Sequence, residues 1–590
     1  MTSHPIIKRL DITRFRGIEH LEWRPANGVN VMVGGGDSGK STVLHAIALL
    51  FSPTNAVQIL ETDYFNRRSD EGFSIEATVE LPDEIGLANL QQTFWPWTWD
   101  GQAGVIPDAD ASGGQETPVY RLRVRGTSEL DLAWEVVQPN DEVVALPVSL
   151  RRRVGVVRLT NDDRNDRDLR LVAGSALDRL LSNGNLKSRI SQKISEVDID
   201  AALQEGETEA LRELDSKLQK AGLPHDLALG LTSSQGLSIG ALIGLLASRD
   251  DVMLPLASWG AGTRRMSSLE IAGSTEAATR LTIIDEIERG LEPYRLRQLI
   301  VKLDEGGGQC FVTTHSPVAV AAAGRGVSAL WYVDIKAKIG SLPREAIENQ
   351  QKRDPETFLA KLPVIAEGIT EVGFLRRIFQ TAFAAQPEFL GIRVCDGGGN
   401  DTMLGLLEAL RDAGLTLGAF CDDEGRFSGR WKAISEALGP RFFQWPKGCL
   451  EENVIKHIAD KNLMALARDP DGASGRRLRT LAVRLDIAEK DETSILKACG
   501  APEMRFARLR SVIIAAATGD TEGAPNDEAK KEWKSHSREW FKSLQGGSEL
   551  VDKAVQLKAW PKIETDILPF INGLRAAFGQ PALALGALRP

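Results

Sequence analysis

The feature that most constrains this chain is a glycine-rich loop between an apolar strand and a helix. The loop Gly34-Gly-Gly-Asp-Ser-Gly39-Lys40-Ser41 fits the pattern GxxxxGK followed by Ser or Thr, between a predicted strand at 28–33 and a predicted helix that begins at Lys40 and runs to Phe51. Its glycines let backbone N–H groups turn toward a phosphate, Lys40 adds positive charge, and the Ser41 hydroxyl can bind Mg²⁺. A structural turn is the alternative, which the strand-loop-helix context disfavours. The expected nucleotide contacts are Gly34, Asp37, Ser38, Gly39, Lys40, Ser41 and Thr42.

A second apolar strand, which ends in two carboxylates, is the expected partner of this loop. The strand at 281–284 is followed by Asp285 and Glu286. We expect Asp285 to hold Mg²⁺ through water and Glu286 to polarise the water that attacks the phosphate. Because Lys40 and Asp285 lie 245 positions apart (285 − 40), an inserted domain must fill the distance.

Length and composition limit the class of protein. A chain of 590 residues predicts two or three domains. The net charge of −10 means that nucleic acid could be bound only through local basic patches or metal ions. Five cysteines without paired spacing argue against a disulfide framework and a zinc ribbon, and predict reduced, mostly buried thiols. We find no apolar stretch that could span a bilayer and no signal-type region, so we expect a cytoplasmic protein.

Two further motifs resemble those of ABC/SMC ATPases. Ser258-Trp-Gly260-Ala-Gly262 precedes the acidic strand as the ABC signature does, and His315 follows the next strand as the switch histidine does. Phe15-Arg16-Gly17 also resembles an N-terminal element of SMC and RecF proteins. The resemblance implies that Ser258, Gly260 and Gly262 complete the ATP site of another protomer, and therefore a homodimer through the ATPase and a helical arm. Taken alone, His315 would more often be structural.

Carboxylates also follow three successive apolar strands in the C-terminal part. They are Glu367 with Glu371 after the first strand, Asp396 after the second, and Asp422-Asp423-Glu424 after the third. In a parallel sheet these strand ends meet at one edge, where clustered carboxylates repel each other unless a divalent cation is present. The pattern predicts a Mg²⁺ or Mn²⁺ site, although solvated acidic loops would be ordinary surface features.

This pattern resembles the TOPRIM fold, and its position after the ATPase resembles the OLD (overcoming lysogenization defect) family. Glu367 matches the first TOPRIM position, whereas Asp422-Asp423-Glu424 departs from DxD, so either Asp423 or Glu424 could be the second acid there. The resemblance implies an ATP-dependent DNA endonuclease or nickase with two metal ions, serving defence against phage or foreign DNA. The metal ligands it implies are Ser41 and Asp285 in one site, and Glu367, Glu371, Asp422, Glu424 and Glu451 in the other.

The segment around Trp540-Phe541-Lys542 resembles class 2 OLD proteins, which include the Gabija nuclease subunit. The resemblance implies that Lys542 stabilises the transition state, with Lys562 as a competitor, and that a UvrD-like helicase could be a partner. The catalytic residues expected on this basis are Glu286, His315, Glu367 and Lys542.

The predicted fold is α/β: an ABC/SMC-like P-loop ATPase with an inserted helical arm, followed by a TOPRIM domain, a Rossmann-like parallel sheet with a helical insertion. The expected boundaries are 1–180 and 236–355 for the two ATPase parts, 181–235 for the arm, and 356–590 for the TOPRIM domain with an insertion at about 460–535. A DNA repair ATPase with a non-catalytic TOPRIM-like scaffold is the first competing hypothesis, and a primase-type nucleotidyl transferase is the second.

Three groups of side chains could contact DNA or serve in the structure, and the sequence alone does not decide between these roles. The first arginine group is interleaved with aspartates, which favours a solvated face: Arg151 to Arg153, Arg158, Arg164, Arg167 and Arg170. For the second group, in the helical insertion, DNA contact and a structural role are equally favoured. Its members are Arg476, Arg477, Arg479, Arg484, Arg505, Arg508 and Arg510. Three alternating tryptophans could stack on bases, but packing of a sheet face is favoured: Trp95, Trp97 and Trp99.

Overall fold

A computed structural model describes most of the chain. The described residues are 4–82, 94–107, 117–159, 243–249, 252–273, 281–323, 328–423, 425–469 and 475–590, with isolated positions between 169 and 212. The predicted arm at 181–235 falls almost entirely outside them. They form two compact units, Met1–Asn30 with Ser41–Thr314, and Val31–Lys40 with His315–Pro590.

The N-terminal unit contains an antiparallel sheet built from strands that alternate buried and exposed residues, as predicted for residues 74–137. Ile12 pairs with Leu21 on one side and with Ile75 on the other, and all three side chains are buried. The strand order is β2-β1-β4-β7, with β5, β6, β8 and β9 alongside. The strands are β1 (Ile6–Phe15), β2 (Ile18–Trp23), β4 (Phe73–Glu80), β5 (Trp97–Trp99), β6 (Gly104–Val105), β7 (Pro118–Gly126), β8 (Leu132–Val137) and β9 (Val143–Ala145).

The tryptophans near β5 serve mainly in packing, as favoured from the sequence. Trp97 is buried, and its indole N–H donates to the Val137 carbonyl oxygen at 2.8 Å. Trp99 packs against the same small apolar cluster, whereas Trp95 is exposed. At least one ring of the three is therefore committed to the sheet face and is not open to a base.

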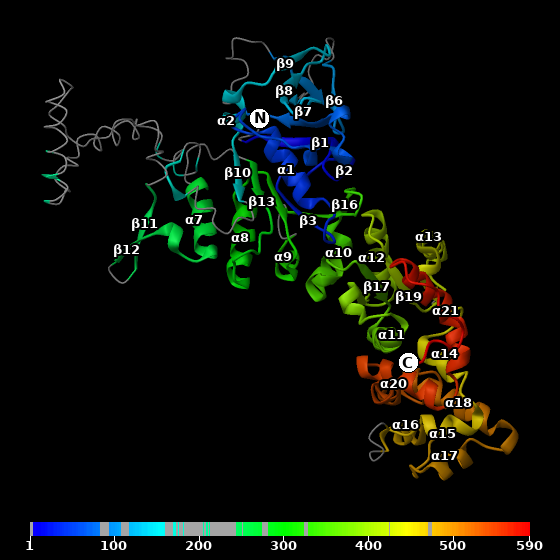
Figure 1. The fold of residues 1–590 in the computed structure, drawn as a ribbon. Helices are drawn as coiled ribbons and strands as arrows, with labels where there is room; N and C mark the ends of the chain where they lie inside the picture. The colour runs from blue at the N-terminus through cyan, green and yellow to red at the C-terminus, as the bar shows by residue number, and fades with distance from the viewer. Residues whose placement is uncertain are drawn as a thin grey trace. The chain divides into compact units, whose positions relative to one another are not determined.

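A mainly parallel, six-stranded sheet carries the nucleotide motifs. Its first four strands run in the order β10 (Val156–Leu159), β13 (Leu281–Ile284), β14 (Cys310–Thr313) and β3 (Val29–Val33), and the hairpin described next completes it. Nearly every residue of the last three strands is buried, because helices cover both faces of such a sheet. The helices labelled in Figure 1 include α1 (Lys40–Leu50), α7 (Ala261–Gly273) and α8 (Pro293–Glu305). The predicted strands at 28–33 and 281–284 and the helix from Lys40 are confirmed.

The C-terminal unit begins with a helix and a hairpin and continues into a second parallel sheet. Its first elements are α9 (Pro317–Ala322), β15 (Ala329–Val333), β16 (Ile339–Leu342) and α10 (Arg344–Arg353). The parallel sheet has the order β18-β17-β19-β20, with β17 (Leu362–Ala366), β18 (Ile392–Asp396), β19 (Gly418–Cys421) and β20 (Phe442–Gln444). Ala366 pairs with Asp396 on one side and Phe420 on the other, so the three predicted strand ends do meet at one edge.

Helices surround this second sheet and extend the unit. They include α11 (Ile369–Ala382), α12 (Asn400–Asp412), α13 (Ser428–Leu438), α14 (Leu450–Ile455), α20 (Leu544–Gln556) and α21 (Trp560–Ala576). The region predicted as a helical insertion contains α15 (Leu463–Leu466), α16 (Arg476–Arg484), α17 (Glu492–Ala498), α18 (Pro502–Thr518) and α19 (Asp527–His536). One hydrophobic cluster runs from Leu362 to Leu588 through these elements.

Helices α11 and α20 approach each other closely because both carry glycine at the contact. A Cβ atom on Gly373 would collide with the Leu544 carbonyl oxygen, and one on Gly547 would collide with that of Thr370. This close contact places the start of α20, and Lys542 just before it, against the helix that carries Glu371.

The first arginine group is in part buried, so its interpretation as a solvated face is wrong for Arg151. Its guanidinium lies 4.1 Å from the ring centre of Trp134 and donates to the Ser52 carbonyl oxygen at 2.6 Å. Arg152 is exposed, as expected, and Arg164 and Arg167 lie outside the described residues.

The second arginine group is divided between structural and exposed members. Arg477 is buried and pairs with Glu549 at 2.7 Å, and Arg510 donates to the Ile455 carbonyl oxygen at 2.6 Å. Arg484 donates to His536 Nδ1 at 3.1 Å. The members that stay exposed are Arg476, Arg479 and Arg508.

The cysteines are free, and four of the five are buried, as predicted. Within the described part of the chain, no helix is both long and apolar enough to cross a membrane.

Candidate functional site

The glycine-rich loop has the backbone that its sequence predicts. Gly34 has φ of 143°, Gly39 has φ of 89° and Asp37 has φ of 57°, values that glycine or a short polar residue adopts most readily. Lys40 is buried, and its ammonium donates to the Gly35 carbonyl oxygen at 2.7 Å and to that of Gly34 at 3.1 Å. The lysine charge is therefore held at the loop, where a phosphate would need it.

The next residue of the same helix contacts the aspartate that follows β13, and the Mg²⁺ site expected from these two residues stays a prediction. The Ser41 hydroxyl donates to Asp285 Oδ1 at 3.0 Å, and the Thr313 hydroxyl donates to the same oxygen at 2.5 Å. The backbone N–H of Glu286 donates to Thr313 Oγ1 at 2.8 Å, and Glu286 has φ of 49°. Thr313 thus orients both acidic residues, a role that was not predicted although the residue ends the strand before His315.

The signature segment contacts the turn that follows the acidic pair. A Cβ atom on Gly262 would collide with the Gly290 carbonyl oxygen, which explains the small residue there. Arg265, one turn into α7, donates to the Asp285 carbonyl oxygen at 2.7 Å. Ser258 donates to the Pro255 carbonyl oxygen at 2.6 Å, and Gly260 has open space around its Cα. Ser258, Gly260 and Gly262 stay predictions as residues of a second protomer's ATP site.

In the C-terminal unit, Glu367 and Asp422 are joined directly at the sheet edge. The backbone N–H of Asp422 donates to Glu367 Oε2 at 2.9 Å, and Asn400 Nδ2 lies 3.4 Å from the same oxygen. The Trp431 indole N–H donates to Asn400 Oδ1 at 3.1 Å, which orients the amide. Asn400 and Trp431 were not predicted, because only the fold brings them to the carboxylates.

Three carboxylates of this edge are buried. The exposed fractions are 4% for Glu371, 8% for Asp422 and 0% for Glu451. Burial, followed by the charges of Glu371, Glu367 and Glu451, raises the pKa of Asp422 to about 9. Burial, and then the charge of Glu451, raises the pKa of Glu371 to about 7. The site therefore favours the protonated, neutral form of these carboxyl groups when no cation is present.

Lys542 is the described cation that contacts this cluster. Its ammonium lies 2.8 Å from Glu451 Oε1. Burial alone would lower the pKa of Lys542, but the charges of Glu451 and Glu371 raise it above its usual value. The competing Lys562 is exposed on α21 and makes no ion pair with a described residue. The structure places Lys542, and not Lys562, against the carboxylates.

The carboxylates fit a hard divalent cation by chemistry. Asp422 Oδ1 and Glu451 Oε2 are buried and accept no hydrogen bond from the described residues, so each has a free lone pair. No three His, Cys, Asp or Glu side chains with described positions already stand close enough together to hold an ion. Glu424 lies outside the described residues, and Asp423 is exposed and accepts a hydrogen bond from Gly425 N–H at 2.8 Å. Their predicted metal roles stay predictions.

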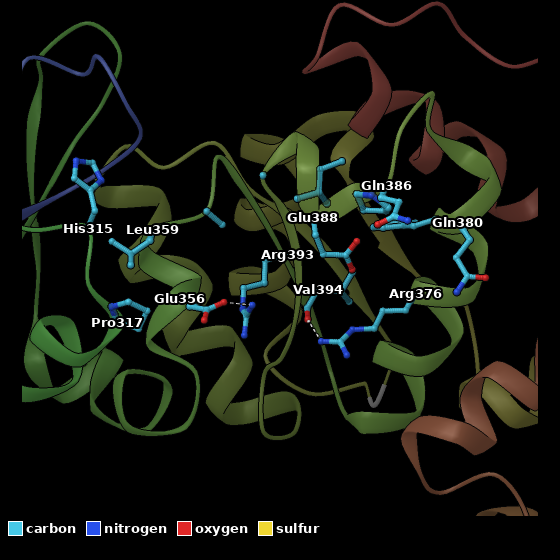
Figure 2. Close-up of a pocket in the computed structure, with 15 residues that line it drawn as sticks. His315, Pro317, Glu356, Leu359, Arg376, Gln380, Gln386, Glu388, Arg393 and Val394 are labelled. Atoms are coloured by element: carbon cyan, nitrogen blue, oxygen red, sulfur yellow. Dashed lines mark hydrogen bonds and ion pairs between the residues drawn. The ribbon is translucent and has the colours of Figure 1, made fainter. Parts of the chain in front are cut away.

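A cleft of about 820 Å³ in the same unit does not include these carboxylates. Figure 2 shows His315 and Pro317 at one end of it and Gln380 and Gln386 at the other, with Arg393 of the edge strand β18 between them. Arg393 pairs with carboxylates, including Asp354 at 2.7 Å, so its charge is neutralised. His315 lies in the C-terminal unit, and its role as a phosphate sensor stays a prediction.

Comparison with known proteins finds similarity to an ATPase domain. Residues 132–321 match the family described as "AAA domain, putative AbiEii toxin, Type IV TA system". A stretch of 44 residues, 8% of this chain, is 48% identical to the DNA replication and repair protein RecF of Nitrosococcus oceani and spans only 12% of that protein. Residues 132–321 of this chain are therefore similar to an AAA-type ATPase domain. The fold around the motifs is α/β, with one antiparallel and one mainly parallel sheet.

Solved structures that match part of this chain include Smc heads and RecF. An Smc head bound to the C-terminal winged-helix domain of ScpA matches 58% of this chain and 99% of its own, at 13% identity and a TM-score of 0.36. An Smc head from Pyrococcus furiosus matches 59% of this chain and 99% of its own, at 13% identity and a TM-score of 0.34. A RecF structure with an ATP analogue matches 58% of this chain and 99% of its own, at 13% identity and a TM-score of 0.31.

Proposed function

We propose that this protein is an ATP-hydrolysing, divalent-metal-dependent DNA endonuclease or nickase of the OLD type, with a TOPRIM nuclease domain. The observation that carries the proposal is the buried group of Glu371, Asp422 and Glu451 beside Glu367 and Lys542. Burying a carboxylate without a partner costs about several kcal/mol per ion, so a group of them is retained where it serves a purpose. Binding of a cation and of a phosphodiester is the purpose that fits these residue types.

The residues of the group would share two tasks, which are cation binding and stabilisation of the transition state. Glu367, Glu371, Asp422 and Glu451 would hold the divalent cations, and Glu424 stays a candidate ligand. Bound Mg²⁺ or Mn²⁺ would supply positive charge to the phosphodiester and make a bound water more acidic. Lys542 would donate to the phosphate oxygens that gain negative charge, since its ammonium already lies at Glu451.

The ATPase residues would control this reaction through the nucleotide state. Lys40, Ser41 and Asp285 would bind Mg²⁺-ATP, and Glu286 would orient the attacking water, with His315 as a sensor of the terminal phosphate. Ser258, Gly260 and Gly262 would act in trans in a homodimer formed through the ATPase and the helical arm. DNA would meet the exposed arginines of the helical insertion, a UvrD-like helicase could be a partner, and the biological role would be defence against phage or foreign DNA.

The test is cleavage of supercoiled plasmid with Mg²⁺ or Mn²⁺, with and without ATP. Wild type should nick or linearise the plasmid, Glu367→Ala should not, and Lys40→Ala should show the dependence on ATP. Glu436→Ala is the matched control, because Glu436 is an exposed carboxylate of the same unit whose only described ion pair, to Lys432, is 3.9 Å long. Loss of cleavage in the control as well would remove the support for a specific site.

The competing function is a RecF-like DNA repair ATPase whose C-terminal unit is a non-catalytic scaffold. The short match to RecF and the neutralisation of Glu451 by Lys542 favour this candidate. It predicts ATP hydrolysis with no cleavage of any plasmid or linear DNA by wild type, under either metal ion. That result would replace the nuclease proposal by the scaffold.

A further inference from the structure

A histidine on the first helix of the nucleotide site lies between two arginines. His45 is four residues after Ser41 on α1, so the two side chains lie on the same face of the helix, one turn apart. Arg16 Nη2 is 3.3 Å from His45 Nε2, and Arg158 Nη2 is 3.3 Å from His45 Nδ1. The imidazole therefore separates two guanidinium groups close to the Ser41 hydroxyl.

One of these two contacts cannot be a hydrogen bond. Burial, followed by the charges of Arg16 and Arg158, lowers the pKa of His45 to about 4, so the ring is neutral at pH 7. A neutral imidazole has one acceptor nitrogen and one N–H, whereas a guanidinium has donors only. His45 can accept from one arginine and must face the other with its own N–H.

The two arginines differ in how well they are paired. Arg16 donates from Nε to Asp63 Oδ1 at 2.8 Å, and its backbone N–H donates to the Asp63 carbonyl oxygen at 2.9 Å. Arg158 has no ion pair with any described residue, and its only described hydrogen-bond contact is the one to His45. Arg158 is consequently the member of the trio whose charge still needs an anion.

The position of Arg158 brings that charge to the Mg²⁺-binding residues. Arg158 lies on β10 and pairs with Ile283 of β13, two residues before Asp285. The charge of Asp285 acts on the guanidinium, although burial lowers the pKa of Arg158 more strongly than Asp285 raises it. A partly buried arginine beside the residues that bind Mg²⁺, without a carboxylate of its own, is suited to a phosphate group.

We propose that Arg158 is a phosphate-binding residue of the ATP site. In the nucleotide-free protein His45 holds the guanidinium beside α1, and bound ATP takes it over with a charge-assisted contact to the phosphate chain. The exchange is favourable because it replaces a contact to a neutral ring by one to an anion and relieves the donor conflict at His45. The proposal concerns the ATPase alone and is independent of the proposed nuclease.

The test is isothermal titration calorimetry of the full chain with Mg²⁺ and a non-hydrolysable ATP analogue, and in parallel with AMP. Arg158→Met keeps an unbranched side chain of similar reach and removes the charge. Since a hydrogen bond to a charged group contributes about 1.5–3 kcal/mol, affinity for the analogue should fall by about tenfold to a hundredfold. Affinity for AMP should change by less than about threefold, because AMP lacks the β- and γ-phosphates.

Arg152→Met is the matched control, because Arg152 is an exposed arginine of the same unit whose one hydrogen bond within the described ranges goes to the Pro53 carbonyl oxygen, at 2.9 Å. It should bind both nucleotides as wild type does. If Arg158→Met does not fold, Arg158→Gln takes its place, with the same expected selectivity. Unchanged affinity for the analogue in a folded variant, or an equal loss for the analogue and AMP, would overturn the proposal, since the first excludes phosphate contact and the second indicates a purely structural role.

Discussion

Asp422→Asn should remove a strong pH dependence of stability. The side chain of Asp422 is 8% exposed, Oδ1 has no described hydrogen-bond partner, and three other carboxylates act on it. Asparagine has nearly the same shape and carries no charge at any pH. The substitution therefore tests the electrostatics of the site with little change in packing.

The sign and size follow from the pKa of Asp422, which is about 9 in the folded protein against about 3.9 in an unfolded chain. Between these values the folded state holds a proton that the unfolded state has released. The stabilisation that Asp422 contributes is fully present below about pH 4 and is lost as the pH rises toward 9, at up to about 1.4 kcal/mol per pH unit. From pH 5.5 to 7.5, wild type should lose up to about 3 kcal/mol relative to Asp422→Asn.

Thermal unfolding in EDTA, followed by calorimetry at half-unit pH steps, measures this difference. At about 2 °C per kcal/mol for a unit of this size, the Tm curves of the two proteins should diverge by about 5 °C between pH 5.5 and 7.5. Glu371 contributes the same slope to both proteins, so the difference isolates Asp422. Parallel curves would refute the inference that the folded protein keeps Asp422 protonated at neutral pH.

Three further predictions concern other contacts. Gly547→Ala should destabilise the C-terminal unit by about 1–3 kcal/mol, measured by urea unfolding, because the new Cβ would collide with the Thr370 carbonyl oxygen. Lys542→Met should destabilise the C-terminal unit by about 1–3 kcal/mol, which is less than the loss of a fully buried pair would cost, because 37% of the lysine side chain is exposed. Adding Glu451→Gln should restore stability. A double variant as unstable as the single one would contradict the pairing. Thr313→Val should lower kcat for ATP hydrolysis about tenfold with a smaller change in KM, and an unchanged kcat would contradict its role in orienting the acidic pair.

Local motifs explain why the conformation of the glycine-rich loop and of the acidic strand could be predicted in detail. The loop from Gly34 to Ser41 and the strand ending at Asp285 are short segments whose conformation follows from their own residues, and both have the predicted structure. Ser41 and Asp285 meet as expected, because parallel strands and the helix after the loop present their ends at one edge. The convergence of Glu367 and Asp422 was predictable by the same argument.

The sequence by itself determined the order of the elements, the two sheet edges that carry charged residues, and the residue types available for chemistry there. Only the tertiary structure decided which residues are buried and paired: Lys542 and not Lys562 contacts Glu451, Arg151 packs on Trp134 instead of facing solvent, and Arg158 shares His45 with Arg16. The physical reason is that a backbone conformation depends on neighbours along the chain, whereas burial and charge pairing in these examples depend on residues 17 (151 − 134) to 113 positions away.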